Sequence, residues 1–312
     1  MDGTGTILTE NITFSGKYLF INANAAGGSV KAEILDENGK VTRPEKGTTV
    51  KLTVTAIYDG VKYTKDFAVY VNGKKLASHD GGYSTWRVNV TEALTEECEI
   101  AVVVENTINE TVYPQMADFT FYGGLYRDVN IICVNESHFD LEYYGSYGVK
   151  ITPEVVEKDA KVEILTTVTN KKEGQTVRYT IYAADGEEVA KVETAETKAV
   201  LEIKDVHLWN GRKDPYLYTF KASISLDGEI IDTVSTKFGC RTFSVDPEKG
   251  FILNGEEYPL RGVSRHQDRW GFGNALLPEH HKEDIELICE VGATTIRLAH
   301  YQHDQYFYDL CD

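Results

Sequence analysis

The chain has 312 residues, of which 42% are hydrophobic, so it can bury more than one core and is not disordered as a whole. Its 32 Lys and Arg against 49 Asp and Glu give a formal charge of −17. This charge argues against nucleic acid and anionic membranes as partners, since both need a cationic face, whereas neutral ligands such as sugars remain compatible.

The five cysteines are widely spaced and include no C-x-x-C pair, so neither a disulfide framework nor a zinc knuckle is predicted. We expect most of them to be small buried hydrophobic residues. No stretch approaches the roughly 18 apolar residues of a membrane span. The start of the chain lacks the basic and apolar regions of a signal peptide. The expected location is therefore a bacterial cytoplasm or periplasm.

Up to about residue 243, short runs of Val, Ile, Thr, Tyr and Phe alternate with polar residues, which predicts β-strands throughout. The clearest run has apolar residues at every second position from Val50 to Tyr58. Tight turns are expected where glycine can accept a positive φ. The candidates are Asp59-Gly60, Asn72-Gly73, Asp185-Gly186 and Asp227-Gly228. Strands patterned in this way usually pack as sandwiches.

Two polar breaks, at residues 135–138 and 246–250, divide the chain into three predicted domains. Their expected ranges are 1–135, 136–243 and 244–312. The second has about the size of one immunoglobulin-like sandwich.

After residue 250 the hydrophobic period changes. We expect a strand at 258–264, a helix at 278–292, a strand at 293–299 and a helix at 304–312. Pro278 suits a helix start, and Gly292 suits a helix end. The buried helix faces should contain Ile285, Ile288 and Cys289 in the first helix, and Tyr306 or Phe307 with Leu310 in the second. This order of elements predicts a parallel sheet of βα units.

Polar side chains gather after both of these strands. The first strand continues into residues 265–270, and the second contains Arg297 and continues into His300 and His303. In a β/α barrel the reacting groups lie at the C-terminal ends of the strands, so these side chains could bind a hydroxylated ligand. Trp270 could stack on a sugar face. A single Arg or His here is more often a structural partner, but two clusters on matching strand ends favour function.

Other catalytic signals are missing from the sequence. His280 and His281 are neighbours on a helix and point in different directions, and no H-E-x-x-H occurs, so a metal held by histidine is not expected. The sequence also contains no G-x-G-x-x-G, P-loop or G-x-S-x-G motif.

Residues 251–312 closely resemble the start of the catalytic barrel in glycoside hydrolase family 2, especially its β-galactosidases. The matching motifs are Asn254-Gly255, Arg261-Gly262-Val263-Ser264-Arg265-His266, Asp284-Ile285-Glu286-Leu287-Ile288, and Arg297 with His300-Tyr301. Gln302 stands where the family usually has proline. Upstream, residues 71–91 and 118–131 resemble the family's jelly-roll sugar-binding domain, and residues 208–224 and 238–255 resemble its immunoglobulin-like domain and exit.

The resemblance implies a mainly β chain: a jelly-roll-like sandwich over 1–135, an immunoglobulin-like sandwich over 136–243, and the first two βα units of a TIM barrel over 244–312. Residues 1–70 depart from the family pattern and resemble strands of other β modules.

The resemblance also implies the N-terminal portion of a retaining β-galactosidase-like hydrolase of O-glycosyl bonds. Such enzymes need two carboxylates about 5–5.5 Å apart. In the family these are glutamates from later strands, so we expect no catalytic pair in this chain and no hydrolysis by it alone. Glu279, Glu283 and Glu286 should be solvent-facing charges on the first helix.

By position in the family motifs, His266 and His300 would contact the sugar or stabilise the transition state. Asp118 would reach galactose hydroxyls, partly beside a sodium ion, and Arg297 would brace the active-site carboxylates. No cofactor is certain; a sodium or magnesium ion is implied for the full-length enzyme. The substrate would be a β-galactoside or a related oligosaccharide, with glucuronic acid and mannose as other glycones of the scaffold.

A second hypothesis, from another class, is a stand-alone carbohydrate-binding or assembly module. In either case an open parallel sheet edge invites pairing with other chains. We therefore expect self-association into a homo-oligomer, or high mobility beyond about residue 250.

Overall fold

The computed structural model describes residues 66–95, 100–104, 112 and 117–312, with side chains from Ala68 onward, and the backbone of five earlier strands. These five are β1 (Gly5–Leu8), β2 (Ile12–Thr13), β3 (Tyr18–Asn22), β4 (Ser29–Leu35) and β5 (Thr49–Ile57). The turn expected at Asp59-Gly60 lies outside the described residues. The chain forms two compact units, residues 1–136 with 267–276, and residues 137–266 with 277–312.

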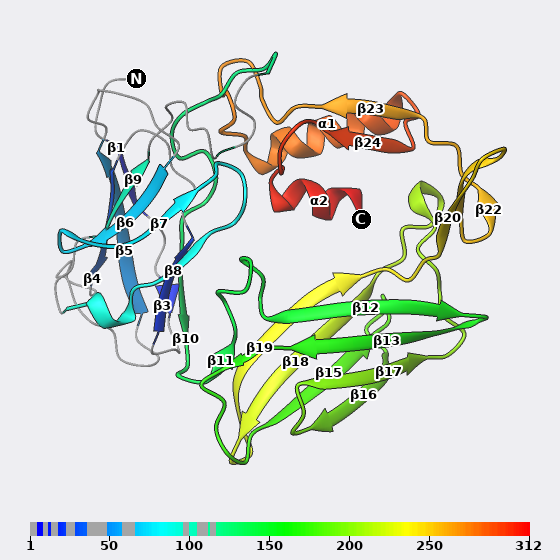
Figure 1. The fold of residues 1–312 in the computed structure, drawn as a ribbon, viewed down its shortest axis with the longest axis horizontal. Helices are drawn as coiled ribbons and strands as arrows, with labels where there is room; N and C mark the ends of the chain where they lie inside the picture. Colours follow the sequence, from blue (N-terminus) through cyan, green and yellow to red (C-terminus); the bar gives the residue numbers. More distant parts are fainter. Residues whose placement is uncertain are drawn as a thin grey trace. The chain divides into compact units, whose positions relative to one another are not determined.

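The first unit is built from short antiparallel sheets (Figure 1). Its later elements are β6 (Asp66–Val71), β7 (Lys74–Asp80), β8 (Arg87–Asn89), the 3₁₀ helix η1 (Thr91–Ala93), β9 (Ile100–Val104) and β10 (Asn130–Val134). The sheet orders are β7-β6-β9, β10-β3-β8, and β1-β5-β2 with β4 also on β5. Inward-facing valines from β6, β8 and β9 form the core, among them Val69, Val88 and Val102. The Asn72-Gly73 turn is confirmed, with φ of 50° and 76° between β6 and β7.

The second unit begins with a β-sandwich, as the alternating pattern predicts. Its elements are β11 (His138–Phe139), β12 (Val149–Val156), β13 (Asp159–Thr166), β14 (Val168–Thr169), β15 (Thr176–Tyr182), β16 (Glu188–Thr194), β17 (Lys198–Ile203), the 3₁₀ helix η2 (Gly211–Lys213), β18 (Tyr218–Leu226) and β19 (Glu229–Phe238). One sheet has the order β12-β13-β17, the other β16-β15-β18-β19, and β11 pairs with β14 (Figure 1).

One apolar core joins the two sheets of this sandwich. Val162 and Leu201 come from the first sheet, and Tyr179, Phe220 and Ile224 from the second. Along β13 buried and exposed residues alternate strictly, which is the period of a strand with one face in a core. The predicted turns at Asp185-Gly186 and Asp227-Gly228 are confirmed, joining β15 to β16 and β18 to β19.

The unit continues into a small sheet and then into βα elements. Strands β20 (Phe243–Asp246), β21 (Gly250–Leu253) and β22 (Glu256–Glu257) precede β23 (Gly262–Arg265), α1 (Pro278–Glu290), β24 (Thr295–Leu298) and α2 (Gln305–Cys311). Strands β23 and β24 pair in parallel, while every other pairing among the described strands is antiparallel. The predicted change from an all-β region to parallel βα units is therefore confirmed.

Local chemistry explains where the two helices begin. Pro278 occupies the first turn of α1, and the Leu277 N–H donates to His280 Nδ1 at 3.1 Å, which satisfies an otherwise unpaired helix donor. Asp304 caps α2, because its side chain accepts from the Tyr306 N–H at 2.9 Å. Of the two aromatic residues expected to face the core, Phe307 is fully buried and Tyr306 is 37% exposed. The expected apolar face of α1, Ile285, Ile288 and Cys289, is half-buried.

A loop of the sandwich holds the βα elements by hydrogen bonds. The Arg212 guanidinium donates to the Ala293 carbonyl at 2.7 Å and to the Cys289 carbonyl at 3.0 Å, which caps the end of α1. Gly211 has a φ of 60°, and a Cβ at this position would lie 2.5 Å from the Tyr258 hydroxyl, so only glycine suits it.

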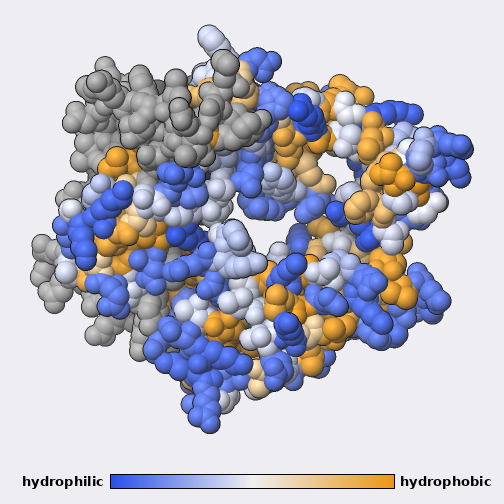
Figure 2. Space-filling view, viewed as in Figure 1, coloured by the Kyte–Doolittle hydropathy of each residue, from blue (hydrophilic) through white to orange (hydrophobic). Residues whose placement is uncertain are grey.

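Apolar side chains also remain on the surface of the second unit. Phe243 is 67% and Val245 76% exposed on β20, and hydrophobic residues gather over β20–β22 in Figure 2. Of the four cysteines that the structure describes, Cys240 is buried, Cys133 and Cys289 are half-buried and Cys311 is exposed, and these four have free thiols. Cys98 lies outside the described residues. Among the described residues, no helix combines the length and the apolar character that crossing a bilayer requires.

Candidate functional site

The parallel pairing of β23 and β24 places two histidines at one end of the sheet. Arg265 lies beside Leu298 in the register, so both strands end at the same level and continue into His266 and His300. The two imidazole rings have centroids 5.2 Å apart and are nearly perpendicular, at 81°. The structure thus brings together two residues that the sequence places after two matching strands, and their contact with a sugar remains a prediction.

Arg297 completes this group from the face of β24 that it shares with Ser264 on β23. Its side chain is exposed, and Nη2 lies 3.1 Å from His300 Nδ1. A guanidinium can only donate, so Nδ1 of His300 accepts, and the neutral ring carries its proton on Nε2. The centroid of the Tyr301 ring lies 5.8 Å from that of the His266 ring.

This arrangement suits a polar, hydroxyl-bearing ligand. His266, His300 and Arg297 offer ring nitrogens and N–H donors at the C-terminal ends of adjacent parallel strands, where β/α folds place their ligands. An exposed guanidinium can also bind a carboxylate through two parallel hydrogen bonds. Whether Arg297 braces catalytic carboxylates, as the sequence resemblance implies, remains a prediction.

Two further predicted residues belong to the other compact unit. Asp118 is exposed, and Trp270 is 98% exposed on the loop 267–276. Gly273 anchors that loop: its φ is 57°, and a Cβ there would lie 2.9 Å from the Tyr122 ring. The roles of Asp118 and Trp270 in sugar binding therefore remain predictions.

Carboxylates on α1 do not form a catalytic pair. Glu279, Glu283 and Glu286 are all exposed, which confirms that these three charges face solvent. Asp284 is engaged in an ion pair with Arg265, with a distance of 2.7 Å between Nη2 and Oδ2. Asp284 therefore has a structural role on α1.

The described residues do not provide a ligand set for the ion that the resemblance implies. Within the described ranges, no group of three or more His, Cys, Asp or Glu could hold a metal, and Asp118 is an exposed single carboxylate. No step of the function proposed below therefore uses an ion.

The sequence placed Arg265 and His303 among the polar side chains that could bind a ligand, but the structure buries both of them. Nothing in the sequence indicated that His281 lies beside them. Arg265 is 6% exposed and faces the helices, where its guanidinium carbon lies 3.9 Å from the centroid of the Phe307 ring. His281 and His303 are also buried beside it. The sequence did give one sign of this buried group, because an arginine at the end of a buried strand is often an ion-pair partner.

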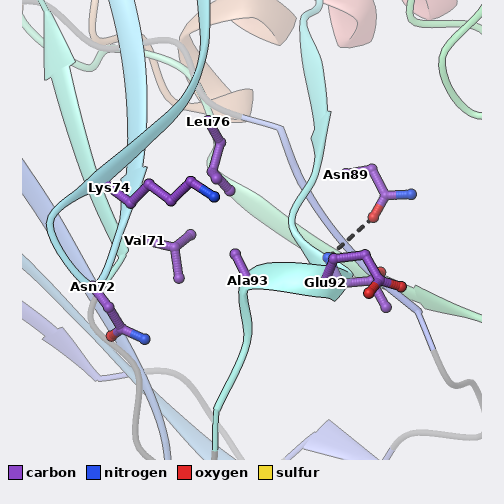
Figure 3. A pocket seen from close by; sticks show the side chains of 8 residues that line it. Val71, Asn72, Lys74, Leu76, Asn89, Glu92 and Ala93 are labelled. Atoms are coloured by element: carbon purple, nitrogen blue, oxygen red, sulfur yellow. Dashed lines mark hydrogen bonds between the residues drawn. The ribbon is translucent and has the colours of Figure 1, made fainter.

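The first unit has a separate pocket of about 520 Å³ between the β6–β7 turn and η1 (Figure 3). Its polar lining includes Asn72, Lys74, Asn89 and Glu92. Asn89 is oriented by its own turn, because its Oδ1 accepts from the Thr91 N–H at 3.0 Å. This pocket is not lined by the site residues predicted from the sequence, which are His266, His300, Asp118, Arg297 and Trp270.

Comparison with known protein families gives two matches, both in the second half of the chain. The family model described as glycosyl hydrolases family 2 matches residues 147–241, and the model described as glycosyl hydrolases family 2, TIM barrel domain, matches residues 245–312. The first match ends at residue 241, just before β20, and the second begins at residue 245, inside that strand.

Individual relatives are also named as glycosidases. The chain is 37% identical over 290 residues to a β-glucuronidase of Bacteroides fragilis, covering 88% of this chain and 41% of that protein. It is 28% identical over 256 residues to a β-galactosidase of Thermoanaerobacter pseudethanolicus, covering 78% and 34%.

Among solved structures, an FMN-binding β-glucuronidase from Facaelibacterium prausnitzii L2-6 matches with a TM-score of 0.80 and 36% identity, covering 100% of this chain and 44% of that one. The chain thus spans about two fifths of the length of these glucuronidases.

Proposed function

Because this chain belongs to glycosyl hydrolase family 2, we propose that it supplies the sugar-positioning part of a retaining β-glycosidase. The observation that carries this proposal is the convergence of His266, His300 and Arg297 at the ends of β23 and β24. These groups donate hydrogen bonds to the ring hydroxyls or the carboxylate of the glycone. The family resemblance implies that the paired carboxylates that break the bond come from later strands, so we expect no hydrolysis of glycosides by these 312 residues alone.

A binding experiment on the full 312-residue chain tests the positioning role. Addition of glucuronate or galactose should shift the ring signals of His266 and His300 in NMR spectra, with a dissociation constant of about 1 mM or weaker. Arg297→Gln should reduce the shifts, whereas the exposed Lys282→Gln on α1 should not. If neither sugar shifts these signals, the positioning role is wrong.

Turnover of a chromogenic β-glucuronide and a chromogenic β-galactoside tests the catalytic part. We expect no rate above that of the His266→Ala variant. Hydrolysis by the chain that the His266→Ala substitution abolishes would contradict the statement that the catalytic carboxylates come from later strands.

β-Glucuronides are the first candidate substrates. The relative that is 37% identical is named a β-glucuronidase, and the exposed Arg297 guanidinium can bind the sugar carboxylate. β-Galactosides are the second candidate, supported by the similarity of residues 261–268 to β-galactosidases and by relatives with that name. Larger NMR shifts with glucuronate than with galactose at equal concentration would favour the first.

A stand-alone carbohydrate-binding module is the alternative of a different class. It predicts saturable binding of lactose, galactose or a glucuronide by calorimetry, at a dissociation constant well below 1 mM. Weak binding localised to the two histidines favours the glycosidase part instead.

Self-association through the βα elements is a further part of the proposal. Leu287 and Val291 are exposed apolar residues on and just after α1, and such surface is commonly buried in an interface. Sedimentation should therefore give a mass above that of the 35.0 kDa monomer, and Leu287→Lys should lower it. A compact monomer at all concentrations would contradict this part.

A further inference from the structure

The buried guanidinium of Arg265 has four side-chain partners around it. Its Nε and Nη2 donate to Asp284 Oδ2 at 2.8 and 2.7 Å. Nη2 also lies 3.1 Å from His281 Nδ1, and Nη1 lies 3.1 Å from His303 Nδ1. The Phe307 ring covers the guanidinium plane at 3.9 Å. We call Arg265, Asp284, His281 and His303 the arginine node.

The partners of the two histidines determine where their protons lie. Because a guanidinium has no acceptor, Nδ1 of both His281 and His303 must accept and cannot carry a proton. Nε2 of His303 lies 3.3 Å from the Ala299 carbonyl, which only accepts, so Nε2 carries the proton. His303 is thus neutral, in one defined tautomer.

Short backbone links join the arginine node to both sugar-facing histidines. His266 directly follows Arg265 in the chain, and His300 directly follows Ala299. The Ala299 N–H donates to the Arg265 carbonyl at 2.9 Å, and His303 holds the Ala299 carbonyl. A displacement of the node would therefore displace both backbone segments that carry the paired imidazoles.

We infer that His281 and His303 are positioning residues, which set the spacing of His266 and His300 only while both node histidines are neutral. This inference rests on the proposed function, because the spacing of His266 and His300 matters only if both bind the sugar. The arginine node itself can be tested without a sugar.

Protonation of either node histidine would disrupt this arrangement. An imidazolium cannot accept at Nδ1, and it would place a second positive charge 3.1 Å from the guanidinium. Asp284 already neutralises the positive charge of Arg265, with 2.7 Å between Nη2 and Oδ2. The other titratable groups nearby are Tyr306 and Tyr308, Tyr301, the cap Asp304, and Cys311. Acidification from about pH 7.5 to about pH 5.5 should therefore break the hydrogen bonds between Arg265 and the two node histidines.

Nitrogen-15 NMR of the full chain tests this inference, with His266 and His300 assigned from their His→Asn variants. At about pH 7.5, His281 and His303 should show an unprotonated Nδ1 and a protonated Nε2. On acidification, the backbone amide signals of His266 and Ala299 should move in the same transition as the ring signals of the node histidines. Nδ1 protonation of His281 or His303 at neutral pH, or independent transitions, would overturn the inference.

Two variants at one position separate positioning from general stability. His281→Asn keeps an acceptor near the Nδ1 position, so it should retain the neutral-pH signals of His266 and His300. His281→Leu removes the acceptor and should shift them at neutral pH, and it should weaken glucuronate binding at least tenfold. The exposed neighbour Lys282→Ala is the control and should change none of these.

The outcomes distinguish the node from the proposed function. Unchanged His266 and His300 signals in a folded His281→Leu chain would overturn the inference. If the His281→Leu variant does not fold, the tautomers and the pH transition of the wild-type chain decide whether the inference holds. Coupled transitions without any sugar binding would support the node and contradict the sugar-positioning proposal.

Discussion

The immunoglobulin-like sandwich and the βα elements of the second unit bury different kinds of side chain. The core of the sandwich is almost entirely apolar, with Phe220, Ile181 and Ile224 fully buried. Beneath β23 and β24, the buried set includes Arg265, His281 and His303. Apolar burial is nondirectional and tolerant, whereas buried polar groups need every partner in place. The sandwich is therefore built for stability, and the βα elements for a defined geometry.

The largest expected effect is in the sandwich core. Phe220→Ala should lower the free energy of unfolding by about 3–5 kcal/mol, because it leaves a cavity among fully buried residues. Urea denaturation of the chain measures this. Phe243→Ala is the matched control, since Phe243 is largely exposed and should cost under about 1 kcal/mol. Similar costs for the two variants would contradict the comparison.

A backbone position at the edge of the sandwich should have the next largest effect. Gly148 has a φ of 67°, and a Cβ there would lie 2.6 Å from the Asp140 backbone nitrogen. Gly148→Ala should therefore cost about 2–4 kcal/mol from left-handed strain and overpacking. Gly228→Ala shares the positive φ but meets nothing within 4 Å, so about 1 kcal/mol is expected. Equal melting temperatures for the two variants would show that the close contact has no cost.

The reactivity of Cys240 reports how well the sandwich core excludes water. Burial raises the pKa of the Cys240 thiol to about 11 from an ordinary value of 9.0, so its thiolate fraction at pH 8 is about a hundredfold lower than that of an ordinary thiol. Timed alkylation with mass spectrometry should therefore modify half-buried Cys289 on α1 long before Cys240. Faster labelling of Cys240 would show that the sandwich opens more readily than the βα elements.

The smallest effect is expected at the link between the two regions. Arg212→Gln removes the charged hydrogen bonds to the Ala293 and Cys289 carbonyls and should cost about 1 kcal/mol at this exposed position. Hydrogen exchange should accelerate in α1 and β24 but not in β15 or β18. Lys213→Gln, at the exposed next residue, is the control. Equal acceleration in the sandwich strands would mean that the two regions unfold as one.

The sequence predicted the parts of the fold that follow from periodicity and turn chemistry. Alternation along β13, the Asp227-Gly228 turn and Pro278 at the start of α1 are each dictated by neighbouring residues. The pairing of His266 with His300 was also predictable, because parallel strands end at a common edge.

The arginine node could not be predicted in this way. Residues 265, 281 and 303 are far apart in the chain, and no period relates them; only the folded βα elements bring their side chains together. A lone histidine on a helix gives no sign of its partner. Similarly, nothing in the composition of residues 267–276 indicates that this loop packs with the first unit rather than with the strands on either side of it.

That loop has a practical consequence for dissecting the protein. The chain passes between its two compact units after residues 136, 266 and 276, so unit one is discontinuous in sequence. A single protease cut or cloning boundary at 136/137 cannot separate the halves cleanly. A fragment starting at Ser137 would keep the loop with Trp270 and Gly273 but would lack Tyr122, the residue against which Gly273 packs.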